Sequence, residues 1–120
     1  MKKNLVLIAA MFYSLHAFAQ TKIRIEEASK HYGETVTICD MLYSGKFMEK
    51  SKLTLLDMGG PYPKSKITVL INFEDRKNFA EKPETFYEKK DACITGKVVE
   101  FNGKPEIVIT KPSDIQIGTE

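Results

Sequence analysis

The sequence lacks the short motifs that identify many enzymes. It contains no GxSxG nucleophile elbow, no Walker phosphate loop, no HExxH zinc motif and no GxGxxG dinucleotide fingerprint. Histidine is scarce, and His31 has no partner at metal-ligand spacing. The carboxylates are scattered, whereas general acid–base catalysis needs two that converge in a cleft. We therefore predict no catalytic residue, no metal site, no cofactor and no enzymatic activity.

Long apolar runs are absent after residue 19. Residues 1–19 begin with a positive charge, continue with a mostly apolar run over 5–18 and end on small residues, which is the pattern of a secretory signal cleaved after Ala19. A spanning helix needs about 20 apolar residues, and this run is shorter and is interrupted by a serine and a histidine. We expect a signal peptide at 1–19, a single domain over 20–120, and a periplasmic or secreted protein.

Neither positive nor negative side chains are in large excess. The chain has 18 lysines and arginines against 16 aspartates and glutamates, for a net charge of +2. The expected signal contains two of those lysines and no acid, so its removal leaves 16 charges of each sign. Proteins that bind nucleic acid non-specifically usually carry a basic excess, because their affinity comes largely from counterion release. No such excess is present globally.

What the sequence does contain is a series of short strands. Period-2 alternation and turn signals predict strands over 35–43, 52–57, 66–73, 92–101 and 104–110. Asn102 and Gly103 form a two-residue hairpin signal between the last two strands. A short helix is expected over 26–31, and the only sizeable helix is placed in the helix-compatible segments 74–79 and 83–89.

Three strands, a helix and a hairpin follow each other in the order of the OB-fold, a five-stranded partly open barrel. SH3-like barrels have five strands but lack that helix. We therefore predict an all-β domain, an OB-fold barrel with one helix between strands three and four and a short N-terminal helix. The residues expected to point inward are Val36, Ile38, Leu42, Ile67, Val69, Ile71, Phe73, Ile94 and Val98.

Five segments also carry a resemblance to a known family. They are VTIC at 36–39, LLDMGGPYP at 55–63, ITVLI at 67–71, CITGKV at 93–98 and GKPEIVI at 103–109. Together they resemble the small bacterial OB-fold domains that occur alone after signal peptides or attached to secreted nucleases. One departure is visible, because such domains often carry glycine at the mid-strand position of Asp40, where it permits a bulge and a sharp bend.

The two cysteines, Cys39 and Cys93, are predicted to lie side by side. In an OB barrel the first half of strand one runs antiparallel to strand four, and pairing Thr35 with Lys97 places Cys39 opposite Cys93. Both are out of phase with their inward neighbours, so both thiols leave the same outer face. A disulfide forms if the α-carbons lie within about 7 Å; two reduced, half-buried thiols are the alternative. A redox-active pair is not expected, because no CxxC motif is present.

OB-folds usually bind ligands on the face of strands two and three and the adjoining loops. On that face a single-stranded nucleic acid would place its phosphates near lysines and its bases on aromatic rings. Solvated surface lysines and a Phe47 that closes the end of the barrel are the alternatives. The candidate ligand-binding residues are Lys46, Phe47, Lys50, Lys52, Thr54, Thr68, Asn72, Asn102 and Lys104.

The leading hypothesis is an exported, non-enzymatic binding module for single-stranded DNA or RNA or another extended polyanion, held weakly. The alternative is a protein- or peptide-interaction module with an envelope protein partner, which would use Leu56 and Leu70 as exposed apolar contacts. A small hydrolase is the third class. The family resemblance implies that catalytic residues belong to the attached nucleases and not to the OB-fold domain.

Overall fold

Alternating apolar residues build one closed sheet in the computed structural model, which describes residues 21–118. The expected signal peptide at 1–19 lies outside the described residues. Within 21–118 the strands are β1 (Thr21–Ile23), β2 (Thr35–Phe47), β3 (Thr54–Met58), β4 (Ile67–Ile71), β5 (Asp91–Phe101), β6 (Lys104–Ile109) and β7 (Ile115–Ile117). The short helices are η2 (Ile25–Lys30), α2 (Phe73–Arg76), α3 (Pro83–Phe86) and η3 (Pro112–Asp114).

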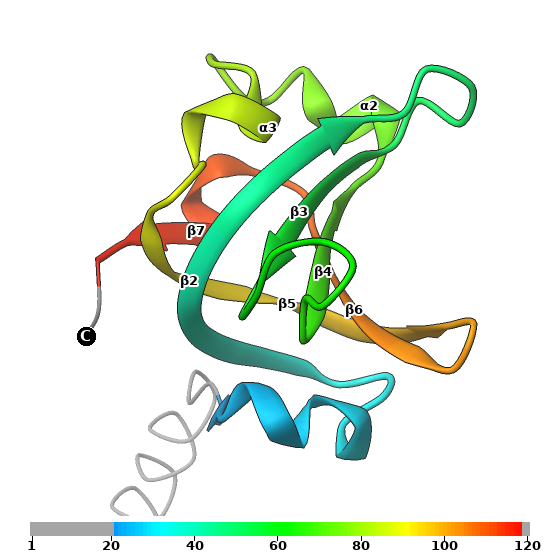
Figure 1. Ribbon diagram of the computed structural model, residues 1–120, viewed down its shortest axis with the longest axis vertical. Helices are drawn as coiled ribbons and strands as arrows, with labels where there is room; N and C mark the ends of the chain where they lie inside the picture. The colour runs from blue at the N-terminus through cyan, green and yellow to red at the C-terminus, as the bar shows by residue number, and fades with distance from the viewer. Residues whose placement is uncertain (1–20, 119–120) are drawn as a thin grey trace, which may run out of the picture.

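Strand β2 closes the barrel by pairing with two different strands. Residues 35–41 pair antiparallel with β5, and residues 42–47 pair antiparallel with β3. The strand order is β1-β2-β3-β4-β6-β5-β7, and the additional β2–β5 pairing joins the sheet to itself. Figure 1 shows β2 curving along the whole length of the barrel. Strands β2 to β6 form the five-stranded OB-fold that the sequence predicts, which is confirmed.

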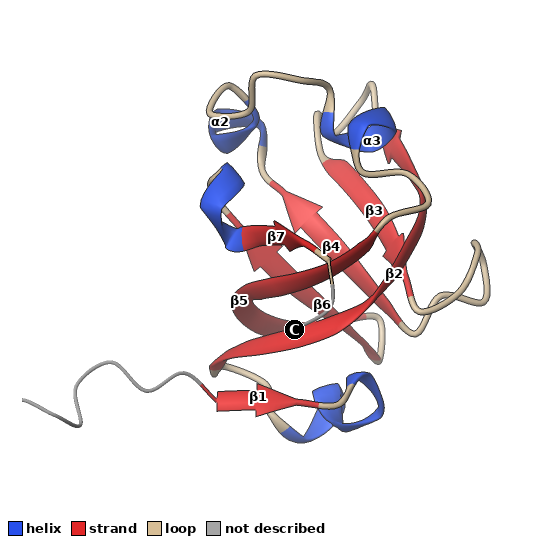
Figure 2. Cartoon of the chain, turned by 90° about the vertical axis from the view of Figure 1, so that its left-hand side faces the viewer, coloured by secondary structure: helices blue, strands red, loops and turns tan. Residues whose placement is uncertain are grey.

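Two short strands extend this barrel and were not predicted. Strand β1 pairs parallel with β2, and β7 pairs antiparallel with β5. Each spans only three residues, which is too short for a period-2 pattern to be recognised. Figure 2 shows β1 and the helix after it at one end of the barrel, and α2 and α3 at the opposite end.

The bend in β2 lies further along the strand than the position of Asp40. The pairing register shifts between Leu42 and Gly45, as it does at a bulge, and a bulge increases the local bend and twist. Asp40 accepts a hydrogen bond from the Met41 amide at 2.7 Å. Glycine is required at position 45, because a Cβ there would lie 2.6 Å from the Cα of Glu84 in α3.

The barrel interior is apolar and matches most of the predicted inward positions. Val36, Ile38, Leu42, Ile67, Val69, Ile71, Ile94 and Val98 are all buried. Phe73 was wrongly predicted to point inward. It is 56% exposed, because β4 ends at Ile71 and Phe73 begins α2.

The second strand points the opposite way from the prediction. Thr54 and Leu56 are buried, at 0% and 2% exposure, whereas Leu55 and Asp57 are half-buried on the outer side. Consecutive leucines make the alternation ambiguous in this strand. Asp57 was the residue that could have resolved it, because an inward-facing carboxylate would be buried in the barrel without water.

The sizeable helix predicted between the third and fourth strands is also corrected. Two four-residue helices, α2 and α3, occupy that segment instead. Pro83 stands at the first position of α3, and a proline lacks the amide that a continuous helix would need there. The short N-terminal helix is present as η2, a 3-10 helix.

A disulfide joins Cys39 and Cys93 across the closing strands. Thr35 lies opposite Lys97 and Cys39 opposite Cys93, as predicted, and the two cysteine α-carbons are 3.9 Å apart. On the same face the hydroxyls of Thr37 and Thr95 are 2.7 Å apart. Disulfides persist mainly in oxidising compartments, so the bond indicates a non-cytoplasmic environment.

Within 21–118 no helix is long and apolar enough to cross a membrane.

Replacing both cysteines by alanine should lower the free energy of unfolding by about 2–4 kcal/mol, because the bond closes a long loop in the unfolded chain. The measurement is urea unfolding of the oxidised protein and of the double variant. Thr37→Val with Thr95→Val, on the same face, is the matched control and should cost about 1 kcal/mol. Equal stability of the wild type and the cysteine variant, or two free thiols in the wild type, would contradict this.

Candidate binding face

The register of four strand pairs places residues in rows across the outer surface of the barrel. Lys46 lies opposite Leu55, Leu55 opposite Leu70, and Leu70 opposite Val108, which in turn lies opposite Lys97. Side chains at such paired positions share one face of the sheet. The first row, defined by these five residues, therefore has half-buried apolar side chains in its centre and an exposed lysine at each end.

A second row runs parallel to the first, two residues away along each strand. Asp57 lies opposite Thr68, Thr68 opposite Glu106, and Glu106 opposite Val99. Ser44 adjoins this row, because its hydroxyl donates a hydrogen bond to the Asp57 carboxylate at 3.1 Å. The second row is therefore polar and includes two carboxylates.

Two recesses lie on this face. The hairpin recess, of about 350 Å³, is lined by Tyr62, Pro63, residues 65–68, Phe101, Asn102 and residues 104–106. The strand recess, of about 470 Å³, is lined by Ser44, Gly45, Lys46, Met48, Leu55, Asp57 and Tyr62. Tyr62 lines both recesses, so they adjoin each other.

Two of the lining side chains are large, aromatic and strongly exposed. Tyr62 is 77% exposed and Phe101 is 59% exposed, and both line the hairpin recess. Asn102 and Gly103, with φ angles of 52° and 78°, form the tight turn that joins β5 to β6 beside Phe101. Flat rings in such positions offer stacking surfaces to planar ligands.

Glu106 is the half-buried carboxylate of the hairpin recess. Its side chain makes no hydrogen bond or ion pair that the structure of residues 21–118 records. Burial against its neighbours raises the pKa of this carboxyl group, because a low-dielectric environment disfavours the charged form. An unpaired acceptor is thus available to a ligand that enters the recess.

The structure brings together four of the nine predicted ligand-binding residues. Thr68, Asn102 and Lys104 line the hairpin recess, and Lys46 lines the strand recess. Lys50 is exposed in the turn that follows β2, and Asn72 stands at the start of α2. Neither of these two lines a recess.

Three other predicted residues lie at the barrel end that α2 and α3 cover. The Lys52 ammonium is 5.8 Å from the centre of the Phe73 ring, and the Arg76 guanidinium is 4.3 Å from the centre of the Phe47 ring. Phe47 therefore packs beneath an arginine rather than presenting a free stacking surface. Thr54 is fully buried and is corrected as a ligand contact, because β3 has the opposite side-chain phase.

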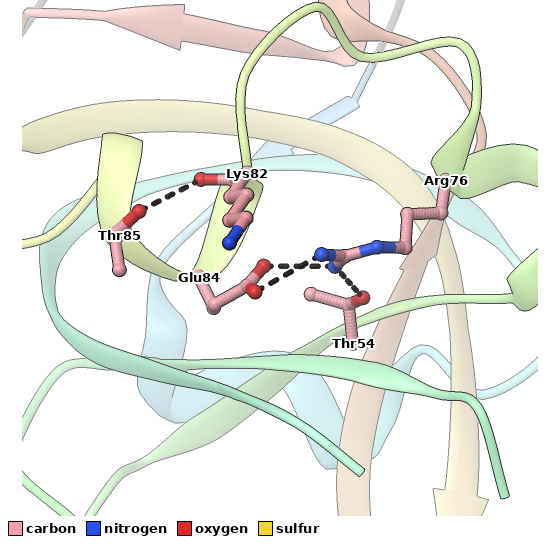
Figure 3. A network of polar contacts seen from close by, with 5 residues as sticks. All are labelled: Thr54, Arg76, Lys82, Glu84 and Thr85. Atoms are coloured by element: carbon pink, nitrogen blue, oxygen red, sulfur yellow. Dashed lines mark hydrogen bonds and ion pairs between the residues drawn. The ribbon is translucent and has the colours of Figure 1, made fainter. Parts of the chain in front are cut away.

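Arg76 organises this barrel end (Figure 3). Its Nη1 donates to Thr54 Oγ1 at 2.7 Å and to Glu84 Oε1 at 2.8 Å, and its Nη2 donates to Glu84 Oε2 at 3.0 Å. The two-pronged pair ties α2 to α3 and satisfies the buried threonine hydroxyl. The hydrogen bonds to Arg76 hold the pKa of Glu84 below its ordinary value, so this cluster is structural.

Several residues of the face were not predicted to bind. The missed residues are Leu55, Asp57, Val108, Lys97 and Glu106. The error in the phase of β3 hid the first two, and pairing between β4 and β6 is parallel, which no local pattern reveals. Within 21–118 no group of three metal-ligating side chains is placed to hold an ion.

Comparisons with known proteins concern the fold. No protein-family model matches the chain, and no curated protein matches it. Among solved structures, the chain is similar to a putative aspartyl-tRNA synthetase from Leishmania major Friedlin, with 12% identity over 100% of this chain and a TM-score of 0.54. It is also similar to asparaginyl-tRNA synthetase from Pyrococcus horikoshii, with 12% identity over 80% of this chain and a TM-score of 0.55.

The chain spans only 26% and 22% of the length of these two synthetases. An OBody bound to hen egg-white lysozyme is similar over nearly its entire length, with 17% identity, 87% of this chain and 99% of that chain covered, and a TM-score of 0.57. These similarities show an OB-fold.

The Arg76–Glu84 pair predicts a pH-dependent stability. Because folding lowers the pKa of Glu84, the pair stabilises the fold above the ordinary carboxyl pKa of about 4.3 and loses this contribution as pH falls through the lowered value. Glu84→Gln should lower the free energy of unfolding by about 1–2 kcal/mol at pH 7, since both side chains are mostly buried. The difference in unfolding free energy between Glu84→Gln and the wild type should become smaller in acid.

Urea unfolding at pH 7 and at pH 3 checks this, with Glu81→Gln as the control in the exposed loop between α2 and α3. The control should leave the unfolding free energy nearly unchanged at pH 7. A Glu84→Gln deficit that is the same at both pH values would show that the ion pair is not its cause.

Proposed function

We propose that this domain is an exported, non-enzymatic binding module that holds single-stranded nucleic acid weakly on the face made by the two rows. The observation that carries the proposal is the arrangement of the first row, in which an apolar strip of Leu55, Leu70 and Val108 lies between Lys46 and Lys97. Five strands at about 4.8 Å spacing make a row roughly 20 Å wide, which spans several nucleotides.

Each chemical part of a single strand has a counterpart on this face. Bases stack on exposed rings such as Tyr62 and Phe101, and the apolar strip accommodates further base surface. Phosphates are attracted by the exposed lysines at the margins, namely Lys46, Lys97 and Lys104. The position agrees with the face on which OB-folds commonly bind oligonucleotides.

Weak binding follows from the charge distribution. Acids and bases are equal in number once residues 1–19 are excluded, so long-range attraction to a polyanion is small. Affinity then depends on a few local lysines and on stacking.

A second candidate function is the capture of a protein or peptide segment. Leu55 and Leu70 lie side by side on the outer face, so Leu55 takes the role predicted for Leu56, which is buried. The OBody bound to lysozyme is an example of a similar fold in a protein complex. An envelope protein would be the partner in that case.

Lys46→Ala combined with Lys104→Ala should weaken binding and its salt dependence. Removing one lysine–phosphate interaction with a single strand reduces the slope of log K against log salt by about 0.7, so the double variant should reduce it by about 1.4. Fluorescence anisotropy with labelled single-stranded DNA and RNA at about 20 to 200 mM salt measures both quantities.

The matched control is Lys30→Ala with Lys111→Ala, which removes two exposed lysines that line neither recess. Its slope should equal that of the wild type. The proposal fails if the wild type shows no saturable binding at low salt, and a pulldown from a periplasmic extract then tests the protein-binding alternative.

A further inference from the structure

Glu106 places a carboxylate on a surface that is proposed to attract phosphates. A carboxylate repels a polyanion, yet this one stands in register between Thr68 and Val99 in the middle of the second row. It lines the hairpin recess together with Tyr62 and Phe101. The Glu106 carboxylate would therefore contact a base that enters the recess, whereas the lysines at the margin would contact the phosphate backbone of the nucleic acid.

The hydrogen-bonding chemistry of a carboxylate limits which bases can bind to Glu106. An ionised carboxylate offers two acceptor oxygens and no donor, and no described residue occupies them with a recorded hydrogen bond. Of the four bases, only guanine presents two adjacent donors on its Watson–Crick edge, the ring N1–H and the exocyclic amino group. Adenine and cytosine pair one donor with a ring acceptor, and thymine has one donor between two carbonyls.

We propose that Glu106 is a specificity-determining residue that selects guanine within a single strand bound on this face, an inference that rests on the proposed nucleic-acid binding. A guanine stacked on Tyr62 or Phe101 directs its edge at the carboxylate and donates two hydrogen bonds to it. Thr68, opposite Glu106 in register, offers a hydroxyl that donates or accepts beside it.

Other charges around Glu106 are placed to assist rather than to replace it. Lys104 begins β6 and lines the same recess, so it brings a cation near a phosphate that flanks the selected base. Lys66 also lines the recess, but its ammonium is 3.2 Å from the Glu26 carboxylate and is paired with it. Tyr62, from the β3–β4 loop, is the other titratable side chain that lines the recess. Strand β5 places Val99 opposite the carboxylate and Lys97 two residues earlier on the same outer face. Asp57 lies beyond Thr68 in the row and is engaged by Ser44.

The test uses labelled heptamers of dT that carry one central guest base, either guanine or hypoxanthine, at low salt and pH 7.5. Hypoxanthine differs from guanine only by the loss of the exocyclic amino group, which isolates one of the two hydrogen bonds. The wild type should bind the guanine guest at least about fivefold more tightly. Glu106→Gln, which keeps the side-chain size and replaces one acceptor by a donor, should bind both guests equally.

Glu100→Gln is the matched control. Glu100 is an exposed glutamate of the same hairpin, and it does not line the recess, so the wild-type preference should persist. The preference of the wild type should also decline as the pH falls, beginning above the range in which an ordinary exposed glutamate protonates, because burial raises the pKa of Glu106 and the protonated acid has lost an acceptor.

The outcomes separate this inference from the proposed function. Saturable binding with equal affinity for both guests, or a guanine preference that survives in Glu106→Gln, overturns the role of Glu106 and leaves nucleic-acid binding intact. The absence of saturable binding to every heptamer overturns both. Binding of a labelled arginine-rich peptide in that event would assign the carboxylate and its aromatic neighbours to a cationic protein segment.

Discussion

The double pairing of β2 is the constraint on which the rest of the structure depends. One strand of 13 residues pairs with β5 over its first half and with β3 over its second half, which closes the sheet into a barrel. The bulge between Leu42 and Gly45 provides the bend, and the Cys39–Cys93 bond fixes the first half covalently. The closure brings β3 and β5 to the two sides of β2, so that the rows continue around the outer face.

The rows across that face connect the barrel to its proposed activity. A polyanion-binding surface is usually recognised by excess basic charge, but here the cations stand at the margins of an apolar strip and a carboxylate stands among the polar residues. Such a face suits recognition of bases better than retention of a backbone. The barrel end that α2 and α3 cover has a different role, because the Arg76–Glu84 pair there is satisfied internally.

The sequence predicted the features that depend on clear alternation and strong local signals. The barrel strands, the Asn102–Gly103 turn and the pairing of Cys39 with Cys93 were all correct, because side-chain parity and topology determine them. The phase of β3 was wrong, since consecutive leucines obscure the alternation, and Thr54 was misplaced with it. The sizeable helix was wrong because Pro83 interrupts the segment. Glu106 could not be found without the parallel β4–β6 register, which arises only in three dimensions.

If the two rows form the binding face, a ligand should perturb their backbone amides, which nuclear magnetic resonance measures directly. The ¹⁵N-labelled oxidised domain is titrated with a dT heptamer that carries one guanine. If the rows bind the strand, the largest amide shift changes fall on Leu55, Thr68, Leu70, Glu106 and Val108, whereas Thr37 and Thr95 beside the disulfide stay unchanged. Shift changes confined to the disulfide face, or none at millimolar ligand, would contradict it.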